Sequence, residues 1–170
     1  QARPNFVFIL ADDMGYGDIG PFGSTKNKTP YLDRMADEGI TLTDFYVSNT
    51  ACTPSRAALL TGTYASRIGM DGAVCLAGDA RGLNPKENTI ADVLKTKGYA
   101  TGCFGKWHLG DQPEFLPLKQ GFDEFVGIPY SNDIWPRHRF NERYNFPPLP
   151  FMKANEVVAH ISDGASQAVL

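Results

Sequence analysis

The stretch that decides the fold class is residues 89–104, TIADVLKTKGYATGCF. Asn88 or Thr89 is placed to cap a helix over residues 90–97, and the glycine that follows is typical of a helix end. Residues 99–104 then favour a strand. A helix that leads into a strand in this way is typical of an α/β fold.

The same alternation continues towards the N-terminus. Residues 6–11 form a continuous apolar run, which predicts a buried parallel strand that opens into a turn at its carboxyl end. Three further elements are predicted: a helix over 31–38 that starts at Thr29-Pro30 and stops at Gly39, a strand over 40–47, and a short helix that starts at Thr53-Pro54, runs through Leu60 and ends at Gly62. The sequence therefore predicts an α/β fold with a mostly parallel sheet flanked by helices, incomplete in this chain.

The character of the sequence changes after about Gly110, because prolines become frequent and helical periodicity fades. A loop-rich excursion of this kind usually forms the wall or lid of a site. A strand is expected at 157–161 and a turn at 162–164. We therefore expect an α/β core over 1–110, followed over 111–170 by the excursion and the start of the next segment.

The composition indicates a globular protein and excludes two classes. With 42% hydrophobic and 12% aromatic residues, 170 residues are enough for a real core. The 16 Lys and Arg against 19 Asp and Glu give a net charge of -3, so there is no basic surplus for nucleic acid. No apolar run approaches the roughly 20 residues that cross a bilayer. Neither a nucleic-acid partner nor a membrane span is expected.

Asp12 and Asp13 follow directly on the predicted strand 6–11. Adjacent carboxylates repel one another, so such a pair favours a cation that binds hard oxygen ligands, Mg²⁺ or Ca²⁺. Taken alone, a solvated Asp turn is the more common role for these residues. Two carboxylates also cannot complete the six to eight oxygens of a Ca²⁺ shell, so further ligands have to come from elsewhere.

Cys52 precedes the predicted helix cap in the stretch 52–56, CTPSR. Unpaired N–H groups at a helix start stabilise negative charge, and Arg56 in the first turn offers a planar fork suited to oxyanions. The alternative is an inert, buried cysteine, but chance would give this pattern on the order of once in a thousand chains of this length. Together with Cys75 and Cys103 the cysteines have no zinc spacing, and at least one of the three is free.

With the Leu-Thr-Gly that ends the predicted helix, this stretch resembles the formylglycine signature of the type I sulfatases, which belong to the alkaline phosphatase superfamily. The resemblance extends over nearly the whole chain and implies that family's fold. Other matching stretches are residues 4–20 with the two aspartates, TPYLD at 29–33, GKWHLG at 105–110, and residues 121–131, which are similar to the arylsulfatase A branch. Several motifs in the right order are far more specific than any one of them.

The resemblance implies a role for each matching residue. Cys52 would be oxidised by a separate maturation enzyme to formylglycine, whose hydrated aldehyde is the nucleophile, and residue 52 would bind the cation with Asp12 and Asp13. Arg56 would steady the hydrated aldehyde, Lys106 would bind a sulfate oxygen, His108 would hydrogen-bond the geminal diol, and Ser131 would donate to the sulfate or to the diol. Without the motif, a surface lysine and a capped histidine would explain Lys106 and His108, yet their spacing on an extended segment puts both on one side.

The expected function is hydrolysis of a sulfate monoester, on a carbohydrate in the first instance. One alternative keeps the fold and changes the substrate to an aryl sulfate, a phosphoester or a phosphonate ester. The other is a non-enzymatic homologue that keeps Cys52 as a thiol and binds sulfated glycans or a partner. The leaving-group pocket is expected from the loops 71–85 and 133–150.

The family pattern also requires an Asp and an Asn as metal ligands and a His and a Lys near the leaving oxygen, and their motifs are not found here. His138 and His160 lack the expected surroundings. The chain is therefore expected to be the N-terminal portion of a longer enzyme. The implied partners are the remaining C-terminal portion, the maturation enzyme, and a sulfated small molecule or glycan. The expected location is periplasmic or extracellular, or lysosomal in a eukaryote.

Overall fold

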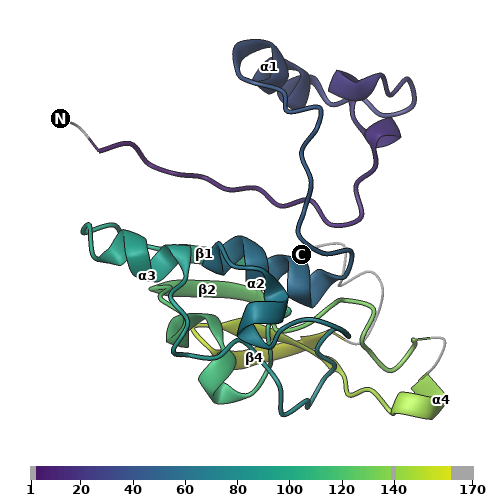
Figure 1. The fold of residues 1–170 in the computed structure, drawn as a ribbon. Coiled ribbons are helices and arrows are strands. Elements are labelled where there is room, and N and C mark those ends of the chain that lie inside the picture. The colour runs from purple at the N-terminus through teal and green to yellow at the C-terminus, as the bar shows by residue number, and fades with distance from the viewer. Residues whose placement is uncertain (1–2, 139–140, 162–170) are drawn as a thin grey trace. The chain divides into compact units, whose positions relative to one another are not determined.

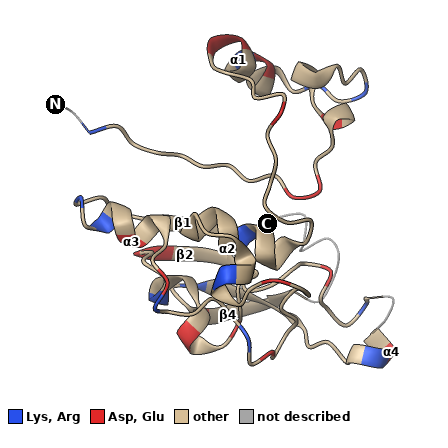
Figure 2. Cartoon of the chain, in the orientation of Figure 1, with Lys and Arg blue, Asp and Glu red and all other residues tan. Residues whose placement is uncertain are grey.

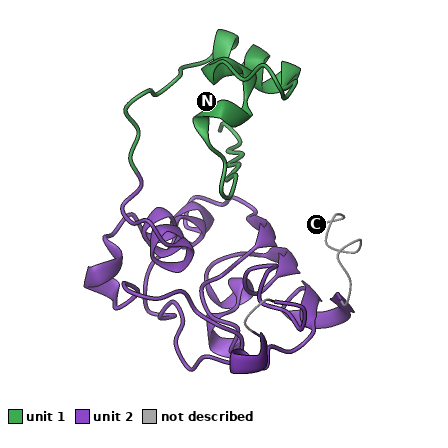
Figure 3. Cartoon of the chain, turned by 90° about the vertical axis from the view of Figure 1, so that its right-hand side faces the viewer, with its two compact units in different colours: residues 1–46 green, residues 47–170 purple. Residues whose placement is uncertain are grey.

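The computed structural model describes residues 3–138 and 141–161 (Figure 1). The chain falls into two compact units, Gln1–Tyr46 and Val47–Leu170 (Figure 3). The turn predicted at 162–164 lies outside the described residues. Within the described ranges, no helix is long and apolar enough to cross a membrane. Lys and Arg residues are interspersed with Asp and Glu residues along the ribbon (Figure 2).

Over residues 3–46, the first unit contains one α-helix, α1 (Pro30–Glu38), and two 3₁₀ turns, η1 (Tyr16–Asp18) and η2 (Gly20–Phe22). The helix predicted at 31–38 is therefore confirmed, with a proline as its first residue and Gly39 after its last. The Thr29 hydroxyl accepts a hydrogen bond from the Gly20 N–H at 2.8 Å and donates to Asp33 at 3.0 Å. These bonds fix the start of α1 beside η2.

The strands predicted at 6–11 and 40–47 are wrong for this structure. Both segments are extended or irregular, and their apolar side chains are exposed, with Phe6 at 65% and Val7 at 86%. A strand needs a neighbour that pairs with its N–H and C=O groups, and no strand of the described residues pairs with either segment. The apolar pattern specifies a face to be buried, but it does not specify the neighbour that buries it.

The second unit is built on a four-stranded sheet with the strand order β1-β2-β3-β4. The strands are β1 (Gly102–Lys106), β2 (Glu124–Ile128), β3 (Leu149–Lys153) and β4 (Glu156–Ile161). β1 and β2 are parallel, whereas β2 with β3 and β3 with β4 are antiparallel. The α/β class is confirmed, and the strand expected at 157–161 is present as β4. The described sheet is mixed rather than mostly parallel.

Two of these strands, β2 and β3, lie in the region predicted to be an irregular excursion. In β3 the strand signal is interrupted by Pro150, which cannot donate to a sheet. The proline is tolerated because β2 pairs only with Met152 and Lys153, at the other end of β3. In β2 the run is broken by Gly127, which lies opposite Gly105 of β1.

Helix α2 (Cys52–Thr61) starts two residues before the predicted start, so Cys52 lies in its first turn. Pro54 is tolerated there because the first four N–H groups of a helix have no acceptor within the helix. The predicted end is confirmed: Gly62 is left-handed, with φ 64°, and its N–H donates to the Ala58 carbonyl.

Helix α3 (Ile90–Lys95) ends two residues before the predicted end, and β1 starts three residues after the predicted start. The helix cap is confirmed, because Thr89 and Asp92 each bond the other's backbone N–H. The last turn tightens to bonds between residues three apart, which shortens the helix. The Thr101 N–H donates to the Asp123 side chain at 2.9 Å and not to a neighbouring strand, so β1 starts only at Gly102.

Figure 1 shows α2 and α3 side by side next to β1 and β2. The core of the second unit consists of two clusters of buried apolar side chains. The larger cluster consists of Ala57, Ala65, Met70, Cys75, Leu83, Trp107, Leu109, Leu116, Phe125 and Met152. The smaller consists of Ile128, Tyr130, Ile134, Phe146, Leu149 and Ile161. The remaining short helices are η3 (Ala65–Ile68), η4 (Pro113–Phe115), η5 (Pro117–Lys119) and α4 (Asn141–Tyr144).

The close approach of β1 and β2 gives a test of this packing. A Cβ atom on Gly127 would lie 1.9 Å from the Gly105 carbonyl oxygen, so Gly127→Ala has to push the two strands apart. We expect the free energy of unfolding to fall by about 2 kcal/mol or more in urea denaturation followed by tryptophan fluorescence.

The control is Gly17→Ala, because Gly17 has open space around its Cα and no positive φ. It should change the stability by less than about 0.5 kcal/mol. Equal stabilities for the two variants would contradict the strand register.

Candidate active site

Three of the residues predicted from sequence motifs meet at one place in the second unit. Cys52 is the first residue of α2, Lys106 is the last residue of β1, and Ser131 follows β2. The Lys106 ammonium lies 3.6 Å from Cys52 Sγ and 3.4 Å from Ser131 Oγ, and it donates to both. The Lys106 ammonium therefore lies within contact distance of the cysteine, which is itself at the N-terminus of a helix. The positive lysine and the helix N-terminus both favour negative charge on residue 52.

Arg56, one turn further along α2, connects the helix to the end of β1. Its Nη1 donates to the Lys106 carbonyl at 2.6 Å. One nitrogen of the guanidinium is thus used to hold α2 against the strand that carries Lys106. The bond fixes the separation between the cysteine and the lysine.

His108 lies two residues beyond β1 and is almost fully buried, with 1% of its surface exposed. Its backbone is left-handed, with φ 62°, which is uncommon for a residue other than glycine. The ring atom Nε2 lies 3.0 Å from the Cys75 carbonyl oxygen. The other ring nitrogen, Nδ1, is buried and has no hydrogen-bond partner among the described residues.

These contacts determine the protonation of the imidazole. Burial lowers the pKa of His108 to about 4, and the Lys106 ammonium adds to this effect. The ring is therefore neutral near pH 7 and carries one N–H. A carbonyl oxygen can only accept, so the proton is on Nε2 and Nδ1 presents a lone pair. This nitrogen is suited to accept a hydrogen bond from a hydroxyl group.

A cavity of about 330 Å³ is lined by Cys52, His108 and Ser131 together with residues of the surrounding loops. Its lining residues are Cys52, Val74, Leu76, His108, Ser131, Asp133, Ile134, His138, Tyr144 and Phe146. Members of both loops expected to form a leaving-group pocket, 71–85 and 133–150, are therefore present in the same wall as the cysteine.

One lining residue, His138, belongs to none of the sequence motifs. Its ring lies edge-on to Phe146, with the ring centroids 5.5 Å apart, and Phe146 in turn stacks on Tyr144 at 5.1 Å. Its proline-rich segment carries no motif, so only its position in the loop 133–150 could have indicated it.

Comparison with known proteins identifies the family of the chain. The sulfatase family model matches residues 4–168 of the chain. The chain belongs to the sulfatase family. Members of this family are sulfuric ester hydrolases of the alkaline phosphatase superfamily.

Human arylsulfatase A is 53% identical over 135 residues, which cover 78% of this chain and 27% of that protein. The crystal structure of Ps i-CgsB in complex with k-i-k-neocarrahexaose has a TM-score of 0.76 at 31% identity and covers 93% of this chain and 38% of that chain. The structure BT33336S-sulf, described with the metabolism of multiple glycosaminoglycans by Bacteroides thetaiotaomicron, has a TM-score of 0.76 at 34% identity, over 92% of this chain and 32% of that one. This sulfatase chain thus spans between 27% and 38% of the length of these relatives.

The predicted metal ligands of this sulfatase chain belong to different units, Asp12 and Asp13 to the first and Cys52 to the second. Both aspartates are exposed, and Asp13 has a left-handed backbone with φ 56°. Their carboxylate oxygens are the donors that Ca²⁺ and Mg²⁺ prefer. In the part of the chain that the structure describes, no three His, Cys, Asp or Glu side chains gather into a metal cluster. The metal site stays a prediction.

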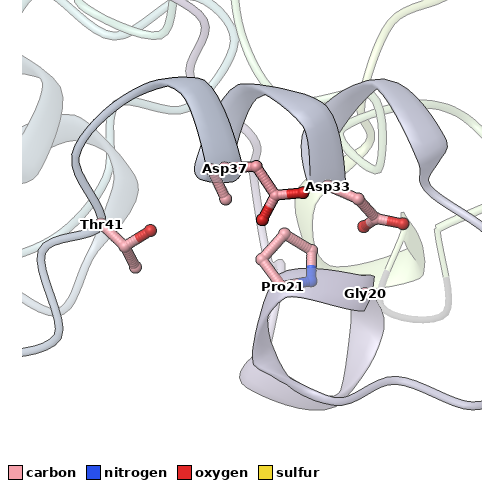
Figure 4. A pocket seen from close by; sticks show the side chains of 6 residues that line it. Gly20, Pro21, Asp33, Asp37 and Thr41 are labelled. Carbon is pink, nitrogen blue, oxygen red and sulfur yellow. The ribbon is translucent and has the colours of Figure 1, made fainter.

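A second hollow, of about 310 Å³, lies in the first unit between α1 and η2 (Figure 4). Two carboxylates, Asp33 and Asp37, face it together with Pro21 and Thr41. Asp33 accepts a hydrogen bond from Thr29 at the start of α1, and none of the predicted site residues lines this hollow.

The low pKa of His108 predicts a dependence of stability on pH. An unfolded histidine has a pKa of about 6.5, so between pH 6.5 and 4 the unfolded chain takes up a proton that the folded chain does not. Stability is therefore lost as the pH falls through this window, by about 3 kcal/mol from this residue. Urea denaturation at a series of pH values measures it.

The variant His108→Asn should remove this part of the pH dependence, because asparagine does not titrate and tolerates a left-handed backbone. The control His160→Asn, at an exposed histidine of β4, should keep it. If His108→Asn and the wild type lost stability equally between pH 6.5 and 4, the neutral, buried state of His108 would be refuted.

Proposed function

We propose that this chain is part of a sulfatase that hydrolyses a sulfate monoester with a formylglycine derived from Cys52 and a bound divalent cation. The observation that carries the proposal is the joint position of Cys52, Lys106 and Ser131 beside the buried His108. Family membership supports the reaction class.

The hydrated aldehyde supplies one hydroxyl that attacks sulfur and a second hydroxyl whose deprotonation expels sulfate and restores the aldehyde. An unmodified thiol would not do this chemistry. In the mature residue, an oxygen atom bonded to Cβ would take the place of Cys52 Sγ. The Lys106 ammonium, 3.6 Å from this atom, is within reach of an oxygen on residue 52 or on a sulfate bound there.

The two neighbouring side chains would then have different tasks. Lys106 would stabilise negative charge that grows on the sulfate oxygens as the S–O bond breaks, with help from Ser131 and Arg56. His108 would accept a proton through Nδ1 from the hydroxyl whose deprotonation releases sulfate, since this nitrogen is buried without a partner among the described residues. The neutral state of the ring supports this role.

The cation would be held by Asp12, Asp13 and residue 52. Carboxylate oxygens fit Ca²⁺, with Mg²⁺ as the alternative, and the shell needs more ligands than these three residues supply. We propose that the missing ligands and the leaving-group acid come from the part of the relatives' length that this chain does not span. When bound, the cation would offset the charge of the sulfate oxygens.

The substrate we propose is a sulfated carbohydrate. Two solved relatives support it, because one contains k-i-k-neocarrahexaose and the other is described with glycosaminoglycan metabolism. Tyr144, which stacks on the buried Phe146 and is 43% exposed, is an aromatic side chain of the cavity wall that a sugar ring could contact. An aryl sulfate is the alternative, which the name arylsulfatase A favours. A screen of sulfated sugars, aryl sulfates and phosphoesters with the complete, matured enzyme distinguishes them.

The proposal also implies partners and a location. A maturation enzyme has to oxidise Cys52, and a homologue whose cysteine stayed a thiol would only bind sulfated glycans. We further propose that the enzyme acts in the periplasm or outside the cell, or in the lysosome of a eukaryote.

The test compares Lys106→Ala with His108→Asn in the complete, matured enzyme. Lys106→Ala should lower kcat/KM by on the order of 10²-fold, as the loss of an oxyanion donor does. His108→Asn should instead slow the release of sulfate, so that sulfate accumulates on the peptide that contains residue 52, which mass spectrometry after quenching detects. If both variants only raised KM at unchanged kcat, the assigned roles would be wrong.

A further inference from the structure

Thr53, next to the nucleophile position, is fully buried and makes two hydrogen bonds through its hydroxyl group. It donates to the His108 carbonyl at 2.9 Å and accepts from the Cys75 N–H at 3.0 Å. The Cys75 carbonyl in turn lies 3.0 Å from Nε2 of His108. These three contacts form a closed ring that joins the first turn of α2, the residues after β1, and the loop at residue 75.

This ring of hydrogen bonds includes the backbone of His108, which has an unfavourable left-handed conformation. The left-handed conformation of a residue with a side chain persists only where the surroundings determine it. The His108 N–H donates to the Pro129 carbonyl at 3.0 Å, and the His108 carbonyl accepts from Thr53. Both peptide groups of His108 are thus fixed, one by the segment after β2 and the other by α2.

The same ring fixes the imidazole. The Cys75 backbone presents its carbonyl to Nε2 while its N–H is held by the Thr53 hydroxyl. Loss of this hydroxyl would leave a buried N–H and a buried C=O without partners, and both would have to move to find new ones. Such a movement shifts the imidazole relative to residue 52, because residue 52 directly precedes Thr53 in the same helix.

We propose that Thr53 is a positioning residue, whose hydroxyl holds His108 at the distance from residue 52 that proton transfer through Nδ1 requires. The inference rests on the proposed role of His108 in sulfate release. It goes beyond that role because it assigns a function to the variable position of the Cys-x-Pro-Ser-Arg pattern. It also predicts that a hydroxyl is needed there, and that the shape of the side chain alone is insufficient.

The experiment uses the complete enzyme, matured and normalised to its aldehyde content by a hydrazide probe, so that incomplete maturation does not enter kcat. Thr53→Val keeps the shape and removes the hydroxyl, Thr53→Ser restores the hydroxyl, and Thr53→Ala is a second deletion should the valine variant not fold. The matched control is Thr89→Val. Thr89 is equally buried and its hydroxyl donates to the Gln120 carbonyl at 2.8 Å, but it caps α3 and does not line the cavity.

We expect Thr53→Val to lower kcat per aldehyde by about tenfold to a hundredfold with little change in KM, as a displaced catalytic group does. Sulfate should accumulate on the residue 52 peptide, as in His108→Asn. Thr53→Ser should recover most of the rate. Thr89→Val should lose stability without loss of kcat. In the His108→Asn background, Thr53→Val should have almost no further effect on kcat.

Failures of this inference and of the proposed function are distinguishable. If His108→Asn accumulates sulfate but Thr53→Val and Thr53→Ala turn over at the wild-type rate per aldehyde, the positioning role of Thr53 is refuted and the sulfatase proposal stands. The same holds if these variants raise only KM, or if Thr53→Ser is as slow as Thr53→Val. If His108→Asn shows no accumulation, the proposed role of His108 fails, and the role of Thr53 fails with it.

Discussion

The contact between the first turn of α2 and the residues that end and follow β1 is the constraint on which the site depends. Arg56 reaches the Lys106 carbonyl and Thr53 reaches the His108 carbonyl. Both residues belong to the helix that starts at Cys52, Thr53 directly after it and Arg56 one turn further on. Each bond joins residues more than forty positions apart in the sequence. The helix therefore holds Cys52 at a fixed position relative to the end of β1. The contact between Cys52 and Lys106 follows from this position.

The electrostatics of the site divide the work between two neighbouring side chains. Lys106 is a fixed positive charge next to residue 52, whereas His108, two residues further on, is kept neutral by burial and by that same charge. A site built in this way can hold an anion with one group and accept a hydrogen bond with the other near neutral pH. A protonated histidine would have no nitrogen that accepts a hydrogen bond. The burial that keeps the ring neutral is therefore needed for its proposed role.

The sequence predicts the local features of this molecule well and the non-local ones poorly. The C-terminal ends of α1 and α2 and the cap of α3 follow from glycine and threonine positions. The motif residues 52, 56, 106 and 108 lie close together in the structure. The apolar run 6–11 failed as a strand because strand formation depends on a partner. The roles of Thr53 and of the Cys75 backbone could not be predicted, because hydrogen bonds across such separations leave no local pattern.

The chemical state of residue 52 in the complete, matured enzyme is the most direct test of the proposed chemistry. Peptide mass spectrometry after unfolding should find that Cys52 has lost hydrogen sulfide and gained oxygen, and that its peptide reacts with a hydrazide. Cys103, a thiol whose pKa is raised by burial, is the internal control and should be labelled only by a thiol reagent. A fully active enzyme in which Cys52 is labelled as a thiol, like Cys103, would contradict the formylglycine mechanism.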